Sequence, residues 1–224
     1  MKDTRHVLVS IAVLGLAMAA VAADLKPIQS AGSDSQGQIA VNGNPFFPIL
    51  LYDAPATNAE ALKMFKEYGF NTLSARPADA DGLLANGFYT AVHTSEKVTK
   101  LDGVLFGMGL DSPAMYLKDD LIPKVKENVE KVRGQVPGRP VMNAIGYWLN
   151  EPAGVISNSI PPKAKYEELV QALDVSAPYL YPVPYQPVRS IAEAVGRAEA
   201  ASGGKKALLP ILQLFAWDAK DRYP

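Results

Sequence analysis

Two acidic residues in this sequence stand where a buried strand is expected to end, and both are candidates for proton-transfer chemistry. Asp111 follows the apolar run "GVLFGMGL", and Glu151 follows "RPVMNAIGYWL" within the stretch "WLNEP". A carboxyl group held in a cleft can donate a proton to a leaving oxygen or accept one from water when its environment adjusts its pKa to the task. The residues alone leave open whether Asp111, Glu151 or neither carries such chemistry.

Further polar and aromatic residues occupy the same kind of position at the ends of expected strands. Arg, His and Asn side chains can hydrogen-bond a polar ligand, and aromatic rings with a polar handle suit the flat faces of sugar rings. Each also has a structural interpretation: Arg76 can pair with a neighbouring acid, and Asp53 can shape the turn that precedes Pro55. The candidate ligand-binding residues are Asp53, Arg76, His93, Trp148, Asn150, Tyr181 and Trp217.

Composition argues against several other kinds of site. The chain has no Cys and only two His, one of them in the first six residues, so a zinc site built from Cys and His is excluded and no metal site is expected. A formal net charge of -1 predicts no nucleic-acid partner. No glycine-rich phosphate loop follows an early strand, so we expect no nucleotide cofactor, and no other cofactor is indicated.

Seven apolar segments that alternate with helical segments are expected to position these side chains. Continuous apolar strands separated by helices are typical of a parallel sheet covered on both faces, in an α/β fold. A complete (β/α)₈ TIM barrel has about 250 residues, whereas this chain has 224 and stops just past its seventh strand. We therefore predict an incomplete (β/α)₈ TIM-barrel type fold with about seven strands, preceded by a short N-terminal β-hairpin that turns at Asn42-Gly43. The expected strands cover residues 39–52, 70–76, 88–94, 103–110, 139–149, 175–183 and 207–217. The expected helices cover residues 57–69, 79–87, 95–101, 117–132, 163–173 and 188–201.

The first residues are typical of an export signal. Lys2 and Arg5 precede a long apolar run that ends in small residues, so 1–23 is predicted to be a signal peptide cleaved near Ala22-Ala23. An uncut membrane anchor is the weaker alternative, because the run falls short of the ~20 apolar residues of a spanning helix. We expect 24–37 to be a linker and 38–224 to be the barrel domain without its last β/α unit. The mature chain is expected to be periplasmic or secreted, with no stable membrane insertion.

Several motifs occur in the order found in one family. "NGNPFFPILLYDAP", "GMGLDSP", "RPVMNAI", "DVSAPYLYPVPY" and "LLPILQLFAW" resemble, over roughly residues 38 to 217, the secreted glycoside-hydrolase-like TIM barrels of the clan-A glycosidase superfamily. The resemblance implies hydrolysis of O-glycosidic bonds in a polysaccharide or oligosaccharide. It also implies an acid/base carboxylate after strand four and a nucleophilic carboxylate after strand seven, because this hydrolysis uses two carboxyl groups.

The sequence departs from the family at both catalytic positions. Asp111 follows the fourth expected strand, but Ser112 stands where relatives often carry a Glu. Glu151 matches the Asn-Glu-Pro signature of many such enzymes but follows the fifth strand, so it becomes the acid only if an early strand is spurious. After the seventh strand no carboxylate appears before Asp218. A non-catalytic carbohydrate-binding barrel and an inactive truncated fragment are therefore the alternatives to a glycoside hydrolase.

Overall fold

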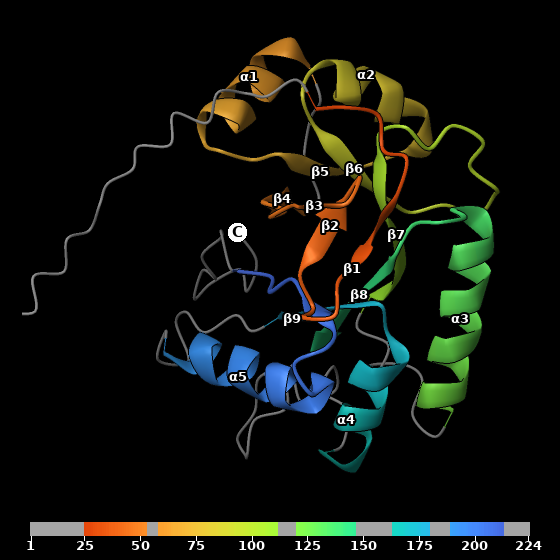
Figure 1. Ribbon diagram of the computed structural model, residues 1–224, viewed down its shortest axis with the longest axis vertical. Coiled ribbons are helices and arrows are strands. Elements are labelled where there is room, and N and C mark those ends of the chain that lie inside the picture. The colour runs from red at the N-terminus through yellow and green to blue at the C-terminus, as the bar shows by residue number, and fades with distance from the viewer. Residues whose placement is uncertain (1–24, 53–57, 112–119, 147–162, 180–188, 213–224) are drawn as a thin grey trace, which may run out of the picture.

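The computed structural model describes residues 25–52, 58–111, 120–146, 163–179 and 189–212 (Figure 1). These residues form two sheets. One is a parallel sheet of seven strands in the order β10-β9-β8-β7-β6-β5-β4, and the other is a small antiparallel sheet in the order β1-β2-β3. The strands are β1 (Ala31–Ser33), β2 (Ile39–Val41), β3 (Asn44–Pro45), β4 (Leu50–Leu51), β5 (Thr72–Ala75), β6 (Tyr89–Val92), β7 (Val104–Asp111), β8 (Val141–Gly146), β9 (Val175–Tyr179) and β10 (Ala207–Leu208).

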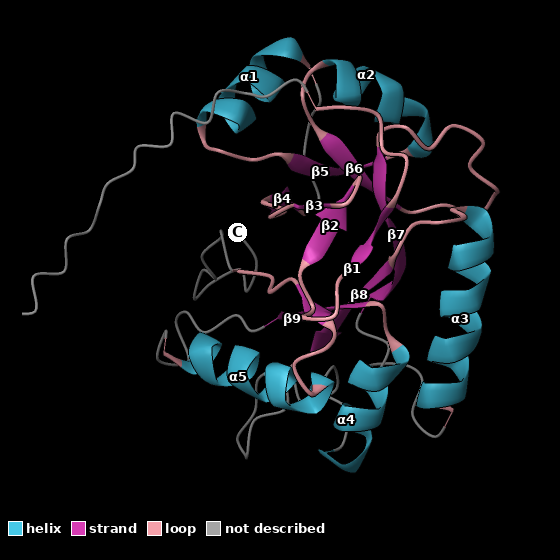
Figure 2. Ribbon diagram, in the orientation of Figure 1, coloured by secondary structure: helices cyan, strands magenta, loops and turns pink. Residues whose placement is uncertain are grey.

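Helices surround the outer, convex side of the parallel sheet, which curls around the strands of the small sheet (Figures 1 and 2). Each strand of the parallel sheet lies beside the next one in the chain. This is the α/β architecture of an incomplete TIM-like barrel, as expected; an eighth strand is not found in the described part of the chain. The helices are α1 (Ala59–Glu67), α2 (Ala80–Ala85), which follows the short 3-10 turn η1 (Pro77–Asp79), α3 (Leu121–Gln135), α4 (Lys163–Ala172) and α5 (Ser190–Ser202).

Helix α3 shows how the apolar pattern fixes the outer layer. The apolar residues that recur at helical spacing in its sequence, Leu121, Val125, Val129 and Val132, are buried against the sheet, with Val125 and Val129 at 0% and 1% exposure. Strands β7 and β8 contribute Val104 and Val141 to the same cluster. Burial of apolar area at about 25 cal/mol per Å² makes this layer a main source of stability.

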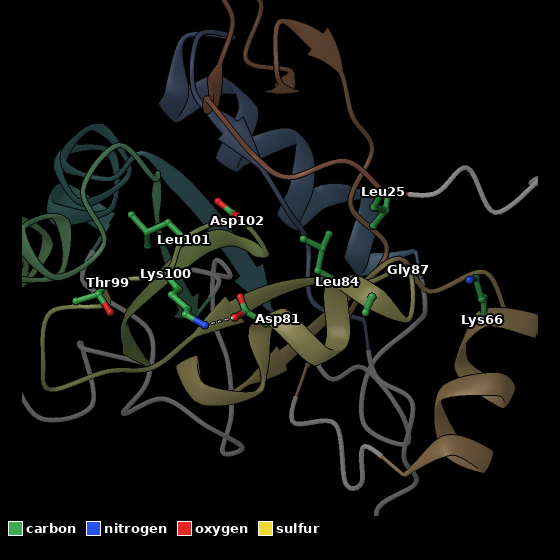
Figure 3. A pocket seen from close by; sticks show the side chains of 10 residues that line it. Leu25, Lys66, Asp81, Leu84, Gly87, Thr99, Lys100, Leu101 and Asp102 are labelled. Carbon is green, nitrogen blue, oxygen red and sulfur yellow. Dashed lines mark hydrogen bonds and ion pairs between the residues drawn. The ribbon is translucent and has the colours of Figure 1, made fainter.

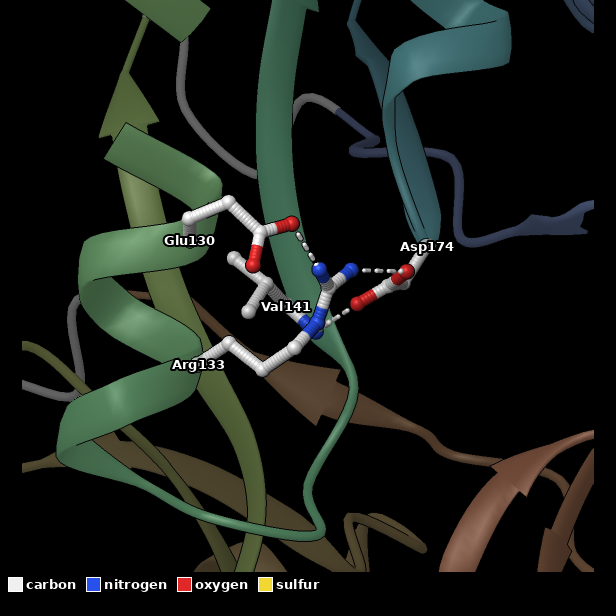
Figure 4. Close-up of polar contacts among 4 residues, drawn as sticks. All are labelled: Glu130, Arg133, Val141 and Asp174. Carbon is white, nitrogen blue, oxygen red and sulfur yellow. Dashed lines mark hydrogen bonds and ion pairs between the residues drawn. The ribbon is translucent and has the colours of Figure 1, made fainter. Parts of the chain in front are cut away.

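Polar contacts join α3 to the amino ends of two strands (Figure 4). Arg133 on α3 donates from Nη2 to Oδ1 of Asp174 over 2.7 Å and also pairs with Glu130. The other oxygen of Asp174 accepts a hydrogen bond from the backbone N–H of Val141 over 3.0 Å. The hydrogen bond that Arg133 donates to Asp174 is the largest cause that raises the pKa of Arg133. One carboxylate therefore links α3, β8 and β9.

The small sheet and the segment before it cover the amino ends of the parallel strands. The Ile28 N–H donates to Asp102 O over 2.8 Å, just before β7. Arg139, just before β8, donates from Nη2 to Ile28 O and Leu101 O over 2.7 and 3.0 Å. Tyr89, which opens β6, donates to Lys26 O over 2.8 Å. The amino-terminal end of the sheet is therefore closed by the chain itself.

The stretch 24–37 differs from the expected linker. Within it, Ala31–Ser33 form β1, which pairs with β2, and Ile28 is only 2% exposed. The predicted hairpin turn lies where expected, between β2 and β3, with positive φ at Asn42 and Gly43 (52° and 77°). This combination is the type I′ turn that favours Asn-Gly in two-residue hairpins.

Two predictions about helices need correction. The segment 95–101, expected to be a short helical turn, is a loop in which Thr94 Oγ1 accepts from the Glu96 N–H and donates to Glu96 O. Such local side-chain hydrogen bonds compete with helix formation. Helix α1 begins at Ala59 and is capped by Asn58, whose Oδ1 accepts from the Ala61 N–H over 2.9 Å; the expected start, Thr57, lies outside the described residues.

In the described part of the chain, no helix is both long and apolar enough to cross a bilayer. The predicted signal peptide lies outside the described residues, so its cleavage stays a prediction.

Candidate functional site

The carboxyl ends of the parallel strands carry three of the polar residues singled out in the sequence, together with Tyr52. Tyr52 follows β4, Arg76 follows β5, His93 follows β6, and Asp111 is the last residue of β7. Because β4 to β7 are consecutive and parallel, all four residues lie along one edge of the sheet. In barrels of this type, ligands and chemistry are found at this edge.

Tyr52 and Asp111 contact each other across the concave side of the sheet. The phenol of Tyr52 donates to Oδ2 of Asp111 over 3.5 Å, although β5 and β6 lie between their strands. Tyr52 packs against the cluster that fills the concave side, together with Met108 and Met142. The Asp111 residue is solvent-exposed. Its carboxylate therefore lies on the inner side of the sheet and within reach of a ligand.

A β-bulge gives Asp111 this orientation. In the pairing of β7 with β8, Met108 lies opposite Met142 and Asp111 lies opposite Ala144, so three steps on β7 match two on β8. Side chains alternate between the two faces of a strand, and Met108 faces the concave side. Leu110 packs instead against the cluster on the helix side, so the extra residue changes the alternation. Without the bulge, Asp111 would point toward the helices.

Arg76 and His93 line a common cavity of about 610 Å³ between η1, the start of α2 and the loop after β6. Arg76 is held there by Asp79, with Nε to Oδ2 and Nη2 to Oδ1 distances of 3.0 and 3.1 Å. The hydrogen bonding of Arg76 to the Asp79 carboxylate, which accepts, is the main cause that raises the pKa of Arg76. The structural role considered for Arg76 is thus present, and Asp111 is not among the residues that line this cavity.

A second cavity, of about 670 Å³, lies at the opposite end of the sheet (Figure 3). It is lined by residues next to the amino ends of β6 and β7, including Gly87 and Asp102, and it shares the ion pair of Lys100 with Asp81, at 3.0 Å, with the cavity of Arg76 and His93. In barrels this end serves stability rather than catalysis. We therefore place the candidate site at the carboxyl ends, around Tyr52 and Asp111.

The count of strands bears on the choice between the two acids. Strand β4 pairs with β5 in the parallel sheet, so no early strand is spurious. Asp111 ends the fourth parallel strand, and Glu151 follows β8, which is the fifth. Six predicted site residues lie outside the described residues, and their positions stay predictions: Asp53, Trp148, Asn150, Glu151, Tyr181 and Trp217. Among the described residues, no group of three or more His, Cys, Asp or Glu could hold a metal ion.

Sequence reasoning missed three polar residues of this region. Tyr52 was visible as a polar residue at the end of a strand, but nothing in its neighbours indicated contact with Asp111. Asn143 is an amide within an otherwise apolar strand and is 1% exposed, a signal that could have been noticed. Asn128 lies on α3 among charged residues, and no sequence signal distinguishes it.

No family model matches the sequence, and no curated protein matches it. Among solved structures, the chain is similar to an FMN-binding beta-glucuronidase from Facaelibacterium prausnitzii L2-6, with a TM-score of 0.54 and 14% identity. That similarity covers 80% of this chain and 32% of the glucuronidase. The chain is also similar to a beta-glucuronidase from Bacteroides uniformis (TM-score 0.47, 13% identity, 80% and 26% covered) and to an aldolase called QR15 (TM-score 0.46, 11% identity, 73% and 78% covered). The likeness to the first glucuronidase, at 14% identity, shows a glycosidase-like fold alone, and this chain spans about a third of that protein.

Proposed function

We propose that this chain is a glycoside-hydrolase-like protein that acts on a polysaccharide or oligosaccharide, with Asp111 as its proton donor. The observation that carries the proposal is the bulge that turns Asp111 to the concave side at the end of the fourth parallel strand, where Tyr52 contacts it. The glycosidase-like fold supports the class of protein but not the assignment of residues.

A carboxyl group at this position can serve as the acid that protonates the oxygen of a leaving sugar. The reaction needs a second carboxylate, which attacks the sugar directly or activates water from about 5 Å or more away. Glu151 is our candidate for that partner and the alternative candidate for the acid. Asp53, Asn150, Tyr181 and the two tryptophans are proposed to hold the saccharide, with Arg76 and His93 contacting it from their cavity.

A non-catalytic carbohydrate-binding barrel is the second candidate function. The observation that favours it is in the sequence, because Ser112 follows Asp111 where related enzymes carry a Glu and Gln213 stands in the last expected strand. Serine cannot act as a general acid at ordinary pH. In this case the same edge of the sheet binds a sugar and does not cleave it.

The test combines saccharide binding with release of reducing sugar. Purified chain is screened against a panel of polysaccharides and aryl glycosides, and then Asp111→Asn, Glu151→Gln and the exposed control Glu67→Gln are compared. We expect Asp111→Asn to retain binding and to lose at least about a hundredfold in kcat, the contribution of a general acid, while the control keeps full activity. Binding without hydrolysis in the unmodified chain would support the second candidate. Hydrolysis that survives Asp111→Asn would reject Asp111 as the donor.

We also propose that the chain is exported and loses its first residues. The signal-like run before residue 24 supports this proposal. Expression of the full sequence in a bacterium, followed by fractionation and mass measurement, should show a mature protein that begins near Ala23. A full-length chain in the membrane fraction would indicate an uncut anchor instead.

A further inference from the structure

Leu110, the residue before Asp111, is held through its backbone by side chains from two other elements. Its N–H donates to Oδ1 of Asn128 on α3 over 3.1 Å. Its carbonyl oxygen accepts from Nδ2 of Asn143 on β8 over 3.2 Å. A bulged residue leaves the regular ladder of hydrogen bonds, and its backbone groups must then find other partners. The two amides supply these partners at the position where the strand changes its alternation.

Asn143 makes this contact from a buried position. It is 1% exposed, and its Oδ1 has no hydrogen-bond partner among the described residues. An apolar residue of the same size would avoid the cost of burying that oxygen, so the side chain is best explained by its contact with Leu110. Gly109 leaves room for it, because a Cβ on Gly109 would lie 2.5 Å from Oδ1 of Asn143.

We infer that Asn128 and Asn143 are positioning residues that hold the β7 bulge and so turn the Asp111 side chain toward the concave side of the sheet. The orientation stands on the geometry of Leu110, whereas its consequence for turnover rests on the proposed function. Both amides contact the backbone of Leu110 and not the Asp111 carboxylate. Their effect on a reaction at Asp111 is exerted through the backbone of β7.

The absence of Cys from the sequence permits a direct test of orientation. The single variant Asp111→Cys places one thiol at the end of β7, and its rate of reaction with a small thiol reagent reports how exposed that side chain is. The same substitution is then combined with Asn128→Ala, which removes the acceptor for the Leu110 N–H, or with Asn128→Asp, which keeps an oxygen acceptor at that position. Thermal unfolding is measured for every variant to show that each is folded.

We expect Asn128→Ala to slow thiol labelling about tenfold, because the side chain at position 111 then turns toward the packed helix layer and reacts only through local opening. Asn128→Asp should label at nearly the rate of the single variant. A loss of stability without reorientation would make labelling faster, so the sign of the change separates positioning from simple destabilisation. Labelling that is unchanged or faster in the Asn128→Ala background would overturn the inference.

Amide hydrogen exchange at Leu110 gives a second readout that does not depend on activity. Protection of this N–H should be lost in Asn128→Ala and kept in Asn128→Asp, and retained protection in Asn128→Ala would contradict the role of Asn128. If the chain hydrolyses saccharides, Asn128→Ala should lower kcat with little change in KM. Slowed labelling together with unchanged kcat would leave the positioning role intact and would reject Asp111 as the proton donor.

Discussion

The phenol of Tyr52 lies 3.5 Å from Oδ2 of Asp111, although Tyr52 follows β4 and Asp111 ends β7, and two other strands lie between them. Neighbouring strands lie about 4.8 Å apart, so three steps across a flat sheet would span roughly 14 Å. The contact is therefore possible only because the sheet is curled. A curled sheet gathers the ends of distant strands around one space, and this gathering is what makes a shared ligand site possible.

Replacing Tyr52 by Phe should change stability little and function more. The hydrogen bond is long, so we expect its loss to lower the free energy of unfolding by less than about 1 kcal/mol. Turnover of a saccharide should fall because the Asp111 carboxylate loses a contact that orients it. Urea denaturation and steady-state kinetics check both parts, with the exposed Tyr68→Phe as control. A large loss of stability with unchanged turnover would show that Tyr52 is a packing residue.

The carboxylate of Asp174 should matter more than that of Glu130, although both contact Arg133. Asp174→Ala leaves the N–H of buried Val141 without its acceptor, which should cost about 1–3 kcal/mol. Glu130 is exposed, so Glu130→Ala should cost less than about 1 kcal/mol. Denaturant midpoints of the two variants measure the difference. Equal losses would indicate that the ion pair, and not the backbone contact, carries the effect.

Arg139 is 6% exposed, and its substitution should lower the free energy of unfolding strongly. Burial is the main cause that lowers the pKa of its guanidinium, and the side chain donates to three backbone carbonyls, those of Ile28, Leu101 and Gly138. Arg139→Met should therefore destabilise the fold by about 1–3 kcal/mol, because the buried Ile28 oxygen loses its donor, whereas the Leu101 oxygen keeps the Val104 N–H. The control Arg76→Met removes an exposed ion pair and should cost under about 1 kcal/mol. A small effect of Arg139→Met would mean that water replaces the guanidinium.

Two glycines near α3 should respond to alanine with opposite signs. A Cβ on Gly107 would lie 2.5 Å from a methyl group of Val136 and 2.7 Å from one of Val132, so Gly107→Ala should destabilise by about 1–3 kcal/mol. Gly134 is within α3 and has open space around it, so Gly134→Ala should stabilise by about 0.5–1 kcal/mol. Thermal unfolding of the pair tests the close approach of helix and strand, which equal melting temperatures would disprove.

The stability of the fold should depend on pH through the ionisation of the Tyr89 phenol. Burial raises the pKa of its phenol above the ordinary value of 10.0, and the hydroxyl donates to Lys26 O. Because the folded pKa is the higher one, this contribution is fully present below about pH 10 and is lost as the pH rises through the raised pKa. The wild-type chain should thus be more stable than Tyr89→Phe at pH 8, and the difference should shrink at higher pH. Urea titrations from pH 8 to 11 measure it, and a constant difference would contradict this origin.

The sequence predicts the architecture better than the orientation of the site. Periodicity identifies the buried face of α3 because large apolar residues such as Val125 mark it. On α5 the larger apolar residues at helical spacing, Ile191 and Val195, are only half-buried, and the small residues Ala194 and Ala198 face the core instead. Small side chains contribute little to a hydrophobic pattern. When a helix packs closely through alanines, the pattern therefore predicts the wrong buried face.

The bulge before Asp111 illustrates a second limit. Simple alternation from Met108 would place Asp111 on the helix side, and only the register with β8 shows that it faces inward. The contacts that accompany this change come from Asn128 and Asn143, which lie 18 and 33 residues from Leu110. Local sequence patterns do not contain such distant contacts. The sequence therefore predicts that Asp111 stands at the end of a strand, but it does not predict the face of the sheet to which its side chain points.

The closure of the amino end by the segment before β1 separates two tasks within one chain. The residues that anchor it, such as Arg139 and Tyr89, precede or open their strands, whereas Tyr52, Arg76 and Asp111 follow or end theirs. Substitutions at the carboxyl ends of the strands can change what the protein binds, while the residues at the amino ends keep the molecule folded. A directed-evolution library confined to the residues that follow the strands should accordingly yield mostly folded variants. A library confined to the residues that precede or open the strands should not.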